Sequence, residues 1–346
     1  MQNQKTENLT KLFSAENEAM PLSVAVKLYF KAHIGTLRPS TIMVYSVALD
    51  QLIEFLGDMA VRDIKKEDIE RWRAWLSSER EIFKNHPRTP TKIAKISIYT
   101  VRKHLSHART FFRWSVDSDQ VPQLNHNPFA GIKLPPKPRS RPKQIEDKTI
   151  EILLDGVQRT DYSRGHYSDD VAAALRARNT AIIHFLRSTG CRLAGMLSLE
   201  LADVTIGDED GHAFVREKGQ GKSSERYVVL DMECTIAFLE WLDHHPNLSP
   251  NAPAFCNVYG ARKGLALSDS GAYAVLARLA KRSKVIGRYS PHTFRHRAVT
   301  KWVEEVDVGA ASQLAGHSSV TVTVDVYARY NLKKLKTAHK KAAGDA

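Results

Sequence analysis

The chain has 346 residues, 42% of them hydrophobic, which is enough to bury more than one core and predicts two domains. Its 51 Lys and Arg residues outnumber its 38 Asp and Glu residues and give a formal net charge of +13. This balance favours a polyanionic partner, above all nucleic acid, although a basic soluble protein without such a partner has the same balance. The three cysteines are scattered, which excludes a disulfide framework and a cysteine metal site.

The chain contains no apolar run long enough to cross a membrane. Residues 1–19 are polar, lack the apolar centre of a signal peptide, and are expected to form a loose tail. We therefore expect a cytoplasmic protein with reduced thiols and no membrane partner.

Residues 20–130 predict a small all-helical domain. A helix over 40–56 begins after a proline, carries one apolar stripe and ends at a glycine. A second helix is expected in KKEDIERWRAWLSSE, before two prolines interrupt the chain in a basic loop. A third helix, over 98–116, has the clearest periodicity of this part of the chain.

The helix over 98–116 has a basic side that predicts contact with DNA phosphates. Its inward positions are apolar, while the other side holds Arg102, Lys103, Arg109 and Arg113. Phosphate contacts from such side chains position a protein on DNA. A solvated charged face has the same pattern, so that alternative remains open.

Residues 131–147 differ in composition from both flanks and predict a domain linker. Several prolines prevent a helix and favour an extended path. Basic residues alternate with them, among them Lys137, Arg139 and Arg141. A stiff basic strap between two domains suits a clamp around DNA, while an ordinary solvated linker is the alternative.

Residues 148–335 predict a second domain, followed by a tail over 336–346. A helix over 176–188 ends at a glycine, and another helix is expected in LAGMLSLELADV. The run FVREKGQGKSSERYVVL predicts two strands around a basic turn that lacks the P-loop spacing. Further helices are expected around 235–242 and 270–283. The fold class is therefore mainly α with a small β-sheet in the C-terminal domain.

The stretch from 290 to 330, which contains SPHTFRHRAVTKW and LAGHSSVTVTVDVYARY, gathers side chains that suit a phosphodiester. It holds His292, Arg295, His317 and Tyr327. Arginine has a planar fork that matches phosphate oxygens, histidine exchanges a proton near neutral pH, and tyrosine carries an oxygen nucleophile. Each residue alone is more often a packed or capping side chain, so it is the combination that predicts a catalytic site.

Four segments, in chain order, resemble the tyrosine recombinase (phage integrase) family: STGCRLAGMLSL, EKGQGKSSERYVVL, SPHTFRHRAVT and LAGHSSVTVTVDVYARY. The resemblance covers about residues 20–335 and is most specific in the second domain. It implies a helical N-terminal core-binding domain and a mixed α/β catalytic domain. The catalytic residues that it implies are Arg192, Lys218 on a β-hairpin, His292, Arg295, His317 and the nucleophile Tyr327.

This chain departs from the family pattern at three places. Gly195 stands where many members carry a Glu, so we expect less support for Arg192. The hairpin turn is longer than the commonest form, which makes Lys222 a second candidate beside Lys218. The spacing from His317 to Tyr327 is one residue longer than usual, and the β-branched run before Tyr327 predicts an extended or loosely turned connection instead of a tight helix.

The resemblance implies cleavage of a DNA strand without a metal, a cofactor or ATP. Two arginines would bind the non-bridging phosphate oxygens, Tyr327 would attack the phosphorus, and Lys218 would protonate the departing 5′ oxygen. His292 would assist proton transfer and His317 would hydrogen-bond the phosphate. The implied product is a 3′-phosphotyrosyl intermediate, which retains the bond energy needed for rejoining.

The implied partners are double-stranded DNA and three further copies of the chain, in a homotetramer on paired sites, with accessory DNA-bending proteins as further candidates. Two alternatives share the sequence features: a type IB topoisomerase-like DNA relaxase, and a DNA-binding or architectural protein without catalysis. All six candidate positions carry competent residue types, which favours an enzyme. The compact chain, the helical N-terminal domain and the Lys-rich tail favour a recombinase, because strand exchange needs a multimer.

Overall fold

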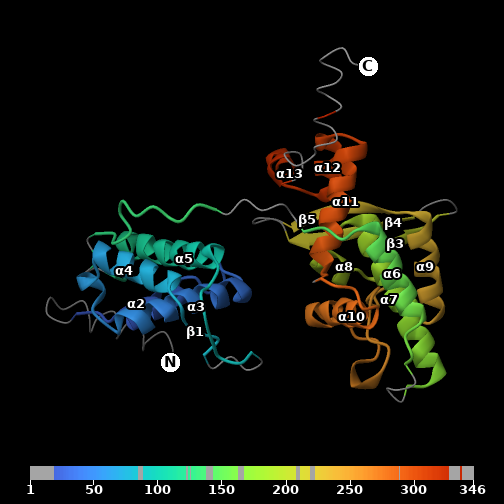
Figure 1. Ribbon diagram of the computed structural model, residues 1–346, viewed down its shortest axis with the longest axis horizontal. Coiled ribbons are helices and arrows are strands. Elements are labelled where there is room, and N and C mark those ends of the chain that lie inside the picture. Colours follow the sequence, from blue (N-terminus) through green and yellow to red (C-terminus); the bar gives the residue numbers. More distant parts are fainter. Residues whose placement is uncertain are drawn as a thin grey trace, which may run out of the picture. The chain divides into compact units, whose positions relative to one another are not determined.

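The computed structural model describes residues 19–84, 89–121, 124, 126–137, 143–162, 167–207, 211–218, 223–287, 289–326 and 336. The chain divides into two compact units, Met1–Ser140 and Arg141–Ala346. Helices make up most of both units, and short antiparallel sheets complete them (Figure 1). The expected mainly α fold is confirmed.

The first unit packs its helices around one aromatic core. The helices are α2 (Leu22–Ala32), α3 (Pro39–Leu56), α4 (Lys66–Ser77) and α5 (Ile98–Asp117), with a 3-10 turn, η1 (Val61–Asp63). Trp72, Phe111 and Phe112 are fully buried in this core. Such side chains bury large apolar areas, which stabilises the helices against one another.

A β-hairpin accompanies these helices, where the sequence suggested a loop in an all-helical domain. Strands β1 (Arg80–Ile82) and β2 (Lys92–Ala94) pair antiparallel, with Arg80 opposite Ala94. The strands are three residues each and none of these residues is fully buried, so no apolar alternation marks them in the sequence. Main-chain pairing between the two strands satisfies their polar backbone groups.

Helix α5 has the amphipathic pattern that the sequence predicts. Its buried side includes Val101, Leu105 and Ala108, and the Ser97 hydroxyl caps its first turn by accepting from the Thr100 amide at 3.1 Å. Two of its basic side chains have an additional role. Arg102 donates to the Pro135 carbonyl and Arg109 to the Ile132 carbonyl, which ties the start of the expected linker to α5.

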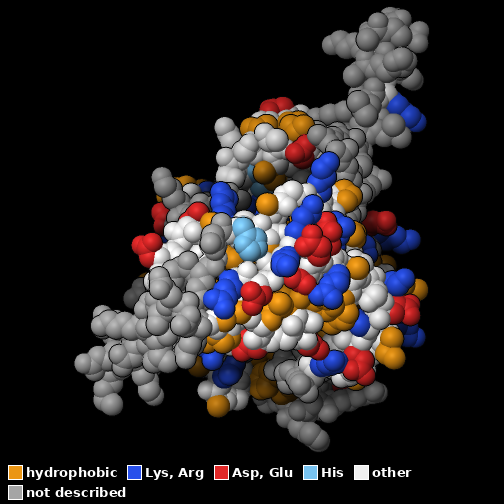
Figure 2. Space-filling view, turned by 90° about the vertical axis from the view of Figure 1, so that its left-hand side faces the viewer, with side chains coloured by type: hydrophobic (Ala, Val, Ile, Leu, Met, Phe, Trp, Pro, Cys, Tyr) orange, Lys and Arg blue, Asp and Glu red, His pale blue; other side chains and the backbone are white. Residues whose placement is uncertain are grey.

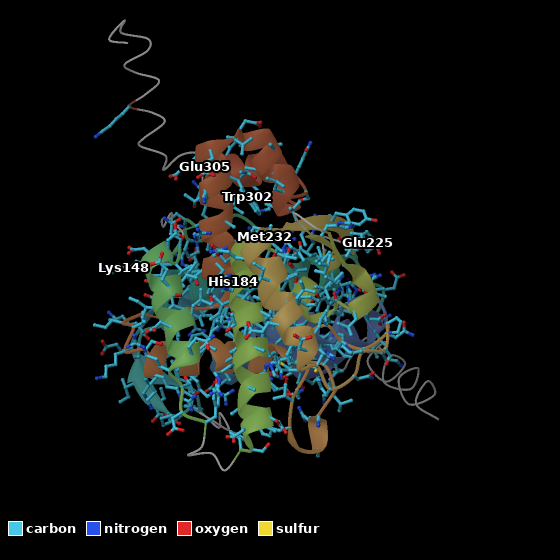
Figure 3. The ribbon with its side chains drawn as sticks, turned by 90° about the vertical axis from the view of Figure 1, so that its right-hand side faces the viewer. Lys148, His184, Glu225, Met232, Trp302 and Glu305 are labelled. Atoms are coloured by element: carbon cyan, nitrogen blue, oxygen red, sulfur yellow. The ribbon has the colours of Figure 1, made fainter. Side chains whose placement is uncertain are left out.

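The second unit surrounds helix α7 with the other elements. The helices are α6 (Asp147–Gln158), α7 (Asp169–Thr189), α8 (Leu193–Leu197), α9 (Met232–Asp243), α10 (Asp269–Arg282), α11 (Pro291–Glu305), α12 (Val308–Ala315) and α13 (Val320–Val326), with 3-10 turns η3 (Leu201–Asp203) and η4 (Gly260–Arg262). Helix α7 contacts α6, α9, α11 and strand β5. His184 on α7 lies beside the start of α9, with its Nδ1 3.7 Å from the Glu233 Oε2; Figure 3 labels His184 and the neighbouring Met232.

The sheet of the second unit has three antiparallel strands in the order β3-β4-β5. They are β3 (Val204–Ile206), β4 (Gly211–Lys218) and β5 (Ser223–Leu230), and the register pairs Lys218 with Ser223. The two long strands are those expected from the hairpin pattern. They bring Glu217 and Arg226 onto neighbouring strands, and both side chains are central to the site.

The helix expected in LAGMLSLELADV is wrong beyond its first turn. Helix α8 ends at Leu197, and the chain continues into η3 and β3. The amide of Leu201 donates to the Ala252 carbonyl at 2.9 Å, and the amide of Ala254 donates to the Leu199 carbonyl at 2.8 Å. These bonds to a distant segment replace the helical ones, so tertiary contacts override a helical pattern.

Candidate active site

The turn between α7 and α8 holds Arg192 at the edge of the second unit. Gly190 ends α7 in the left-handed region with φ 51°, and a Cβ at this position would lie 2.7 Å from the Ala298 Cβ. Arg192 follows as the N-cap residue of α8, with extended backbone angles. Its side chain is 35% exposed and therefore accessible to a ligand.

Arg295 lies on α11 and is 3% exposed. One guanidinium nitrogen donates to the Gly190 carbonyl at 2.9 Å, and another donates to the Ala315 carbonyl at 2.5 Å. Arg295 thereby joins the turn before Arg192 to the turn before His317. These residues are far apart in sequence, and the fold brings them together.

A buried carboxylate, which sequence reasoning missed, lies among the arginines. Glu217 on β4 is 1% exposed. Its Oε1 accepts from the Arg192 amide at 2.6 Å and lies 4.0 Å from an Arg295 guanidinium nitrogen, while its Oε2 contacts the Arg192 guanidinium. Burial by itself raises the pKa of Glu217, but Arg226, the Arg192 amide and the other two guanidiniums outweigh burial and lower that pKa below its ordinary value. The side chain is thus ionised at neutral pH.

Arg226 is a third arginine of the cluster and was also missed. It lies on β5 and donates to Glu217 Oε1 at 3.2 Å and to the Leu314 carbonyl at 2.7 Å. Three guanidiniums therefore surround one carboxylate, which leaves a net positive charge. The one signal in the sequence was the alternation of the predicted hairpin, which puts 217 and 226 on paired strands but does not say that charged side chains face inward.

His292 and His296 lie one turn apart on α11, with ring centroids 4.3 Å apart. Partial burial, followed by the charges of Arg295 and Arg192, lowers the pKa of His292. Burial and His292, with Arg295 and His317, lower the pKa of His296 to about 4. Arg295 contributes to both shifts, and Arg192 contributes to that of His292. His296 was not among the predicted residues.

His317 follows α12, which ends at Gly316 in the left-handed region. Its Nδ1 lies 2.7 Å from the hydroxyl of the buried Thr323. Burial, followed by Arg295 and Arg192, lowers the pKa of His317 to about 4, so the imidazole is neutral near pH 7.

The prediction of an extended or loosely turned connection after His317 is wrong, because Val320–Val326 forms helix α13. The hydroxyl of Ser319 accepts from the Thr321 amide at 3.2 Å at the start of this helix. Thr323, within this helix, is buried and lies next to His317. Six of the seven residues of α13 are β-branched, each with an intrinsic helix penalty of less than about 1 kcal/mol, and the Ser319 cap and the buried Thr323 oppose this cost.

Two predicted catalytic side chains lie outside the described part. Lys218 ends β4, and its main chain pairs with Ser223, but its side chain is not described. The alternative Lys222 and the expected nucleophile Tyr327 fall outside the described residues. The described candidates Arg192, His292, Arg295 and His317 are brought together.

The described residues among those predicted to contact DNA have two different surroundings. Lys103, Arg113 and Lys137 are exposed, and Arg102 and Arg109 bind backbone carbonyls. Arg139 and Arg141 fall outside the described residues. The face in Figure 2 carries Lys and Arg side chains interspersed with Asp and Glu.

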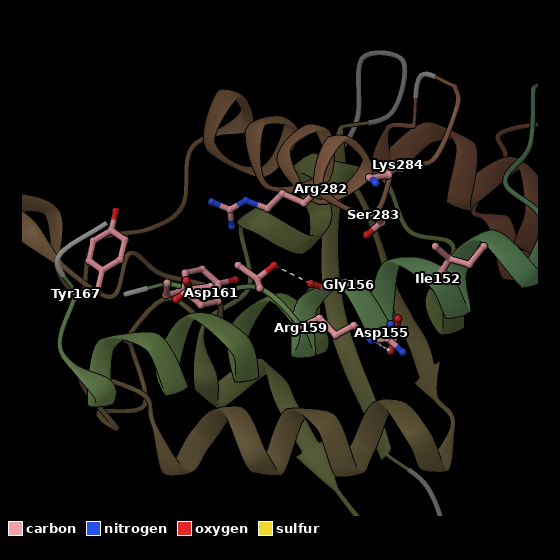
Figure 4. A pocket seen from close by; sticks show the side chains of 11 residues that line it. Ile152, Asp155, Gly156, Arg159, Asp161, Tyr167, Arg282, Ser283 and Lys284 are labelled. Carbon is pink, nitrogen blue, oxygen red and sulfur yellow. Dashed lines mark hydrogen bonds and ion pairs between the residues drawn. The ribbon is translucent and has the colours of Figure 1, made fainter. Parts of the chain in front are cut away.

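A pocket of about 660 Å³ lies elsewhere in the second unit, between α6 and the end of α10 (Figure 4). Its lining includes Asp155, Arg159, Arg282 and Lys284, and none of the predicted catalytic residues. Within the described residues, no group of three or more His, Cys, Asp or Glu side chains is arranged to hold a metal ion. None of the described helices is both long and apolar enough to span a membrane.

Comparison with known proteins places both units in one family. Residues 165–334 match the phage integrase family, and residues 22–77 match the phage integrase N-terminal SAM-like domain. The chain belongs to the phage integrase family. The SAM-like match falls on α2 to α4, and the integrase match includes the arginine cluster, His292 and His317.

Curated tyrosine recombinases and a solved recombinase structure are similar to this chain along most of its length. Tyrosine recombinase XerD of Listeria innocua is 25% identical over 245 residues, which cover 70% of this chain and 75% of XerD. Tyrosine recombinase XerC of Bacillus pumilus is 24% identical over 305 residues, covering 86% and 88% of the two chains. The structure of XerH recombinase bound to palindromic difH substrate has a similar fold, with a TM-score of 0.65, 19% identity and coverage of 98% and 89%.

Proposed function

We propose that this phage integrase family member is a site-specific DNA recombinase that cleaves and rejoins strands through a 3′-phosphotyrosyl intermediate. The observation that carries the proposal is the convergence of Arg192, Arg295, His292 and His317 in one positively charged site. Membership of a family whose curated relatives include tyrosine recombinases supports the same chemistry.

Cleavage is a phosphoryl transfer with a tyrosine oxygen as the nucleophile. Tyr327 attacks the scissile phosphorus, its phenolic proton leaves, and the bond from phosphorus to the 5′ oxygen breaks. Lys218 protonates that oxygen, and the products are a 3′-phosphotyrosine and a free 5′ hydroxyl. Attack by a 5′ hydroxyl of another strand reverses these steps, so rejoining requires no ATP.

The arginines stabilise the charge that develops on the phosphorane oxygens. Arg192 is accessible to the phosphate, while Arg295 is held in place by two backbone carbonyls. Both guanidiniums also favour the phenolate form of an adjacent tyrosine, whose free pKa is about 10. Electrostatic stabilisation of the transition state is the largest contribution expected here.

The histidines act in their neutral forms near pH 7. Because the pKa of His292 is lowered, its imidazole has a lone pair that can accept a proton during attack. His317, whose orientation is set by the Thr323 hydroxyl, hydrogen-bonds the phosphate. These assignments follow the family motif and agree with the charge state of each imidazole.

The partner is double-stranded DNA, contacted by both units. In this proposal residues 20–130 form the core-binding domain, 131–147 a basic strap and 148–335 the catalytic domain. Exposed Lys103, Arg113 and Lys137 contact phosphates. Strand exchange takes place in a tetramer on two sites, with accessory DNA-bending proteins as further candidates. XerH, the structural relative, is bound to its difH substrate.

A suicide substrate tests the proposal directly. Duplexes of random sequence are first selected for binding. A set of the selected duplexes is then made, each with a nick at a different position. When cleavage occurs next to a nick, the short fragment with the free 5′ hydroxyl diffuses away and rejoining is prevented. Protein linked covalently to a 3′ end supports the proposal, whereas binding without linkage supports a DNA-binding protein that lacks catalysis. Relaxation of supercoiled DNA that lacks the selected site favours the topoisomerase alternative.

The nucleophile is identified on the selected substrate. We expect Tyr327→Phe to bind the site but to form no covalent complex, because only the hydroxyl is removed. The matched control Tyr330→Phe is expected to form it. If Tyr330→Phe is the variant that fails, the nucleophile assignment is wrong although the recombinase proposal stands.

A further inference from the structure

The first turn of α8 is capped from a distant strand. In a capping box, the side chain three residues after the N-cap accepts a hydrogen bond from the N-cap amide. Arg192 is the N-cap of α8, and the residue three positions later is Gly195, which has no side chain. The acceptor is instead Glu217 on β4, whose Oε1 lies 2.6 Å from the Arg192 nitrogen.

The space beside Gly195 is already filled by the Glu217 side chain. A Cβ on residue 195 would lie 2.8 Å from the Glu217 Cγ and 3.4 Å from its Oε1. Contacts as short as the first do not occur for real Cβ atoms. A side chain at 195 and the present Glu217 therefore exclude each other.

The same carboxylate is linked through Arg226 to the end of α12, just before His317. Arg226 donates to Glu217 Oε1 at 3.2 Å and to the Leu314 carbonyl at 2.7 Å. A Cβ on Gly316 would lie 2.6 Å from the Arg226 Nε, so the glycine lets the turn approach the guanidinium closely. Glu217 and Arg226 thus connect the backbone on both sides of the site.

We propose that Glu217 is the positioning residue that orients Arg192 toward the scissile phosphate, in the place of a carboxylate on α8 itself. The contact to both the main chain and the guanidinium of Arg192 fixes the direction of that side chain. Arg226 neutralises the carboxylate, so that Arg192 retains positive charge for a ligand. This inference rests on the proposed recombinase function, because the phosphate is its ligand.

Moving the carboxylate from residue 217 to residue 195 tests the inference. The variants are Glu217→Ala, Glu217→Gln, Gly195→Glu and the double variant Gly195→Glu/Glu217→Ala. Each is assayed for melting temperature and for single-turnover cleavage of the selected suicide duplex over a range of protein concentrations. Glu225→Gln is the matched control, since Glu225 is exposed on β5 of the same hairpin (Figure 3).

At saturating protein, we expect Glu217→Ala to cleave about 100-fold more slowly, with DNA half-saturation unchanged, because a misdirected Arg192 affects the reacting centre. Glu217→Gln keeps one acceptor oxygen and is expected to be intermediate. Gly195→Glu is expected to lower both the cleavage rate and the melting temperature through overlap. The double variant has a carboxylate at the capping position and room for it, so its cleavage rate and its melting temperature are both expected to recover.

Several outcomes overturn the inference. It fails if Glu217→Ala cleaves like the wild type, or if the double variant is no more stable and no faster than Glu217→Ala. Loss of DNA affinity without loss of the maximal rate assigns Glu217 a merely structural role. If the wild type itself forms no covalent complex, the proposed function fails, and the melting temperatures still decide whether 195 and 217 exclude each other.

Discussion

The two units use buried and half-buried arginines in opposite ways. On α5, Arg102 and Arg109 donate to the neutral carbonyls of Pro135 and Ile132 and tie a following segment to the helix. In the second unit, three arginines surround Glu217, whose single negative charge cannot neutralise them. A guanidinium bound to backbone carbonyls holds two segments of the chain together, whereas a cluster with excess positive charge can bind an anion.

The same contrast exists inside the cluster. Arg295 is 3% exposed and holds two carbonyls, while the Arg192 side chain is 35% exposed and rests on the carboxylate. In the proposed reaction we therefore expect Arg295 to contribute to both stability and chemistry, and Arg192 mainly to chemistry. The substitutions Arg295→Ala and Arg192→Ala separate these contributions.

Replacement of the buried arginine is expected to have the largest effect. Arg295→Ala leaves the carbonyls of Gly190 and Ala315 without their partner and removes a transition-state donor. We expect cleavage of the suicide substrate to fall by about 1000-fold and the free energy of unfolding to fall by about 3 kcal/mol. Single-turnover kinetics and urea titration measure the two effects. If Arg295→Ala is inactive but as stable as the wild type, Arg295 does not stabilise the fold.

The exposed arginine separates chemistry from stability. Arg192→Ala is expected to reduce cleavage by about 100-fold to 1000-fold while site binding remains near that of the wild type. Its free energy of unfolding should change by about 1 kcal/mol or less, because the side chain is partly solvated. Near-wild-type cleavage would exclude Arg192 from the site.

The arginines of α5 allow the opposite test. We expect Arg109→Ala to lower the free energy of unfolding by about 1 kcal/mol, since the Ile132 carbonyl loses its donor. The exposed Arg113 has no such role, and Arg113→Ala should instead reduce the log–log salt slope of DNA binding by about 0.9. A salt slope that changes equally in both variants would remove the distinction.

A pH dependence of stability is expected in both units. His104 in the first unit and His317 in the second have pKa values of about 4, with burial as the main cause, against 6.5 in an unfolded chain. Between pH 6.5 and 4 the unfolded state binds more protons at these histidines, so their contribution to stability falls as the pH falls through this window and changes little below about 4. Urea titrations at pH 7, 5.5 and 4 measure the loss, and His104→Gln should reduce it.

The sequence by itself determined most helices and the chemistry-bearing residue types. Apolar stripes and helix-ending glycines are local signals, and they predicted α3, α5 and the end of α7 closely. His292, Arg295 and His317 were singled out by their residue types in one stretch, Arg192 was added from the family resemblance, and the fold brings the four together. The assignments of Lys218 and Tyr327 stay predictions, because the structure does not describe their side chains.

Only the tertiary structure decided which charges are buried and what orients them. Glu217 and Arg226 are ordinary hairpin residues in the sequence, and Gly195 reads as a lost support for Arg192 until β4 supplies the carboxylate. The early end of α8 and the helical form of α13 likewise depend on hydrogen bonds to distant segments or buried partners. The physical reason is that propensity and periodicity act over a few neighbouring residues, whereas the energy of a buried charge depends on groups that only folding brings near.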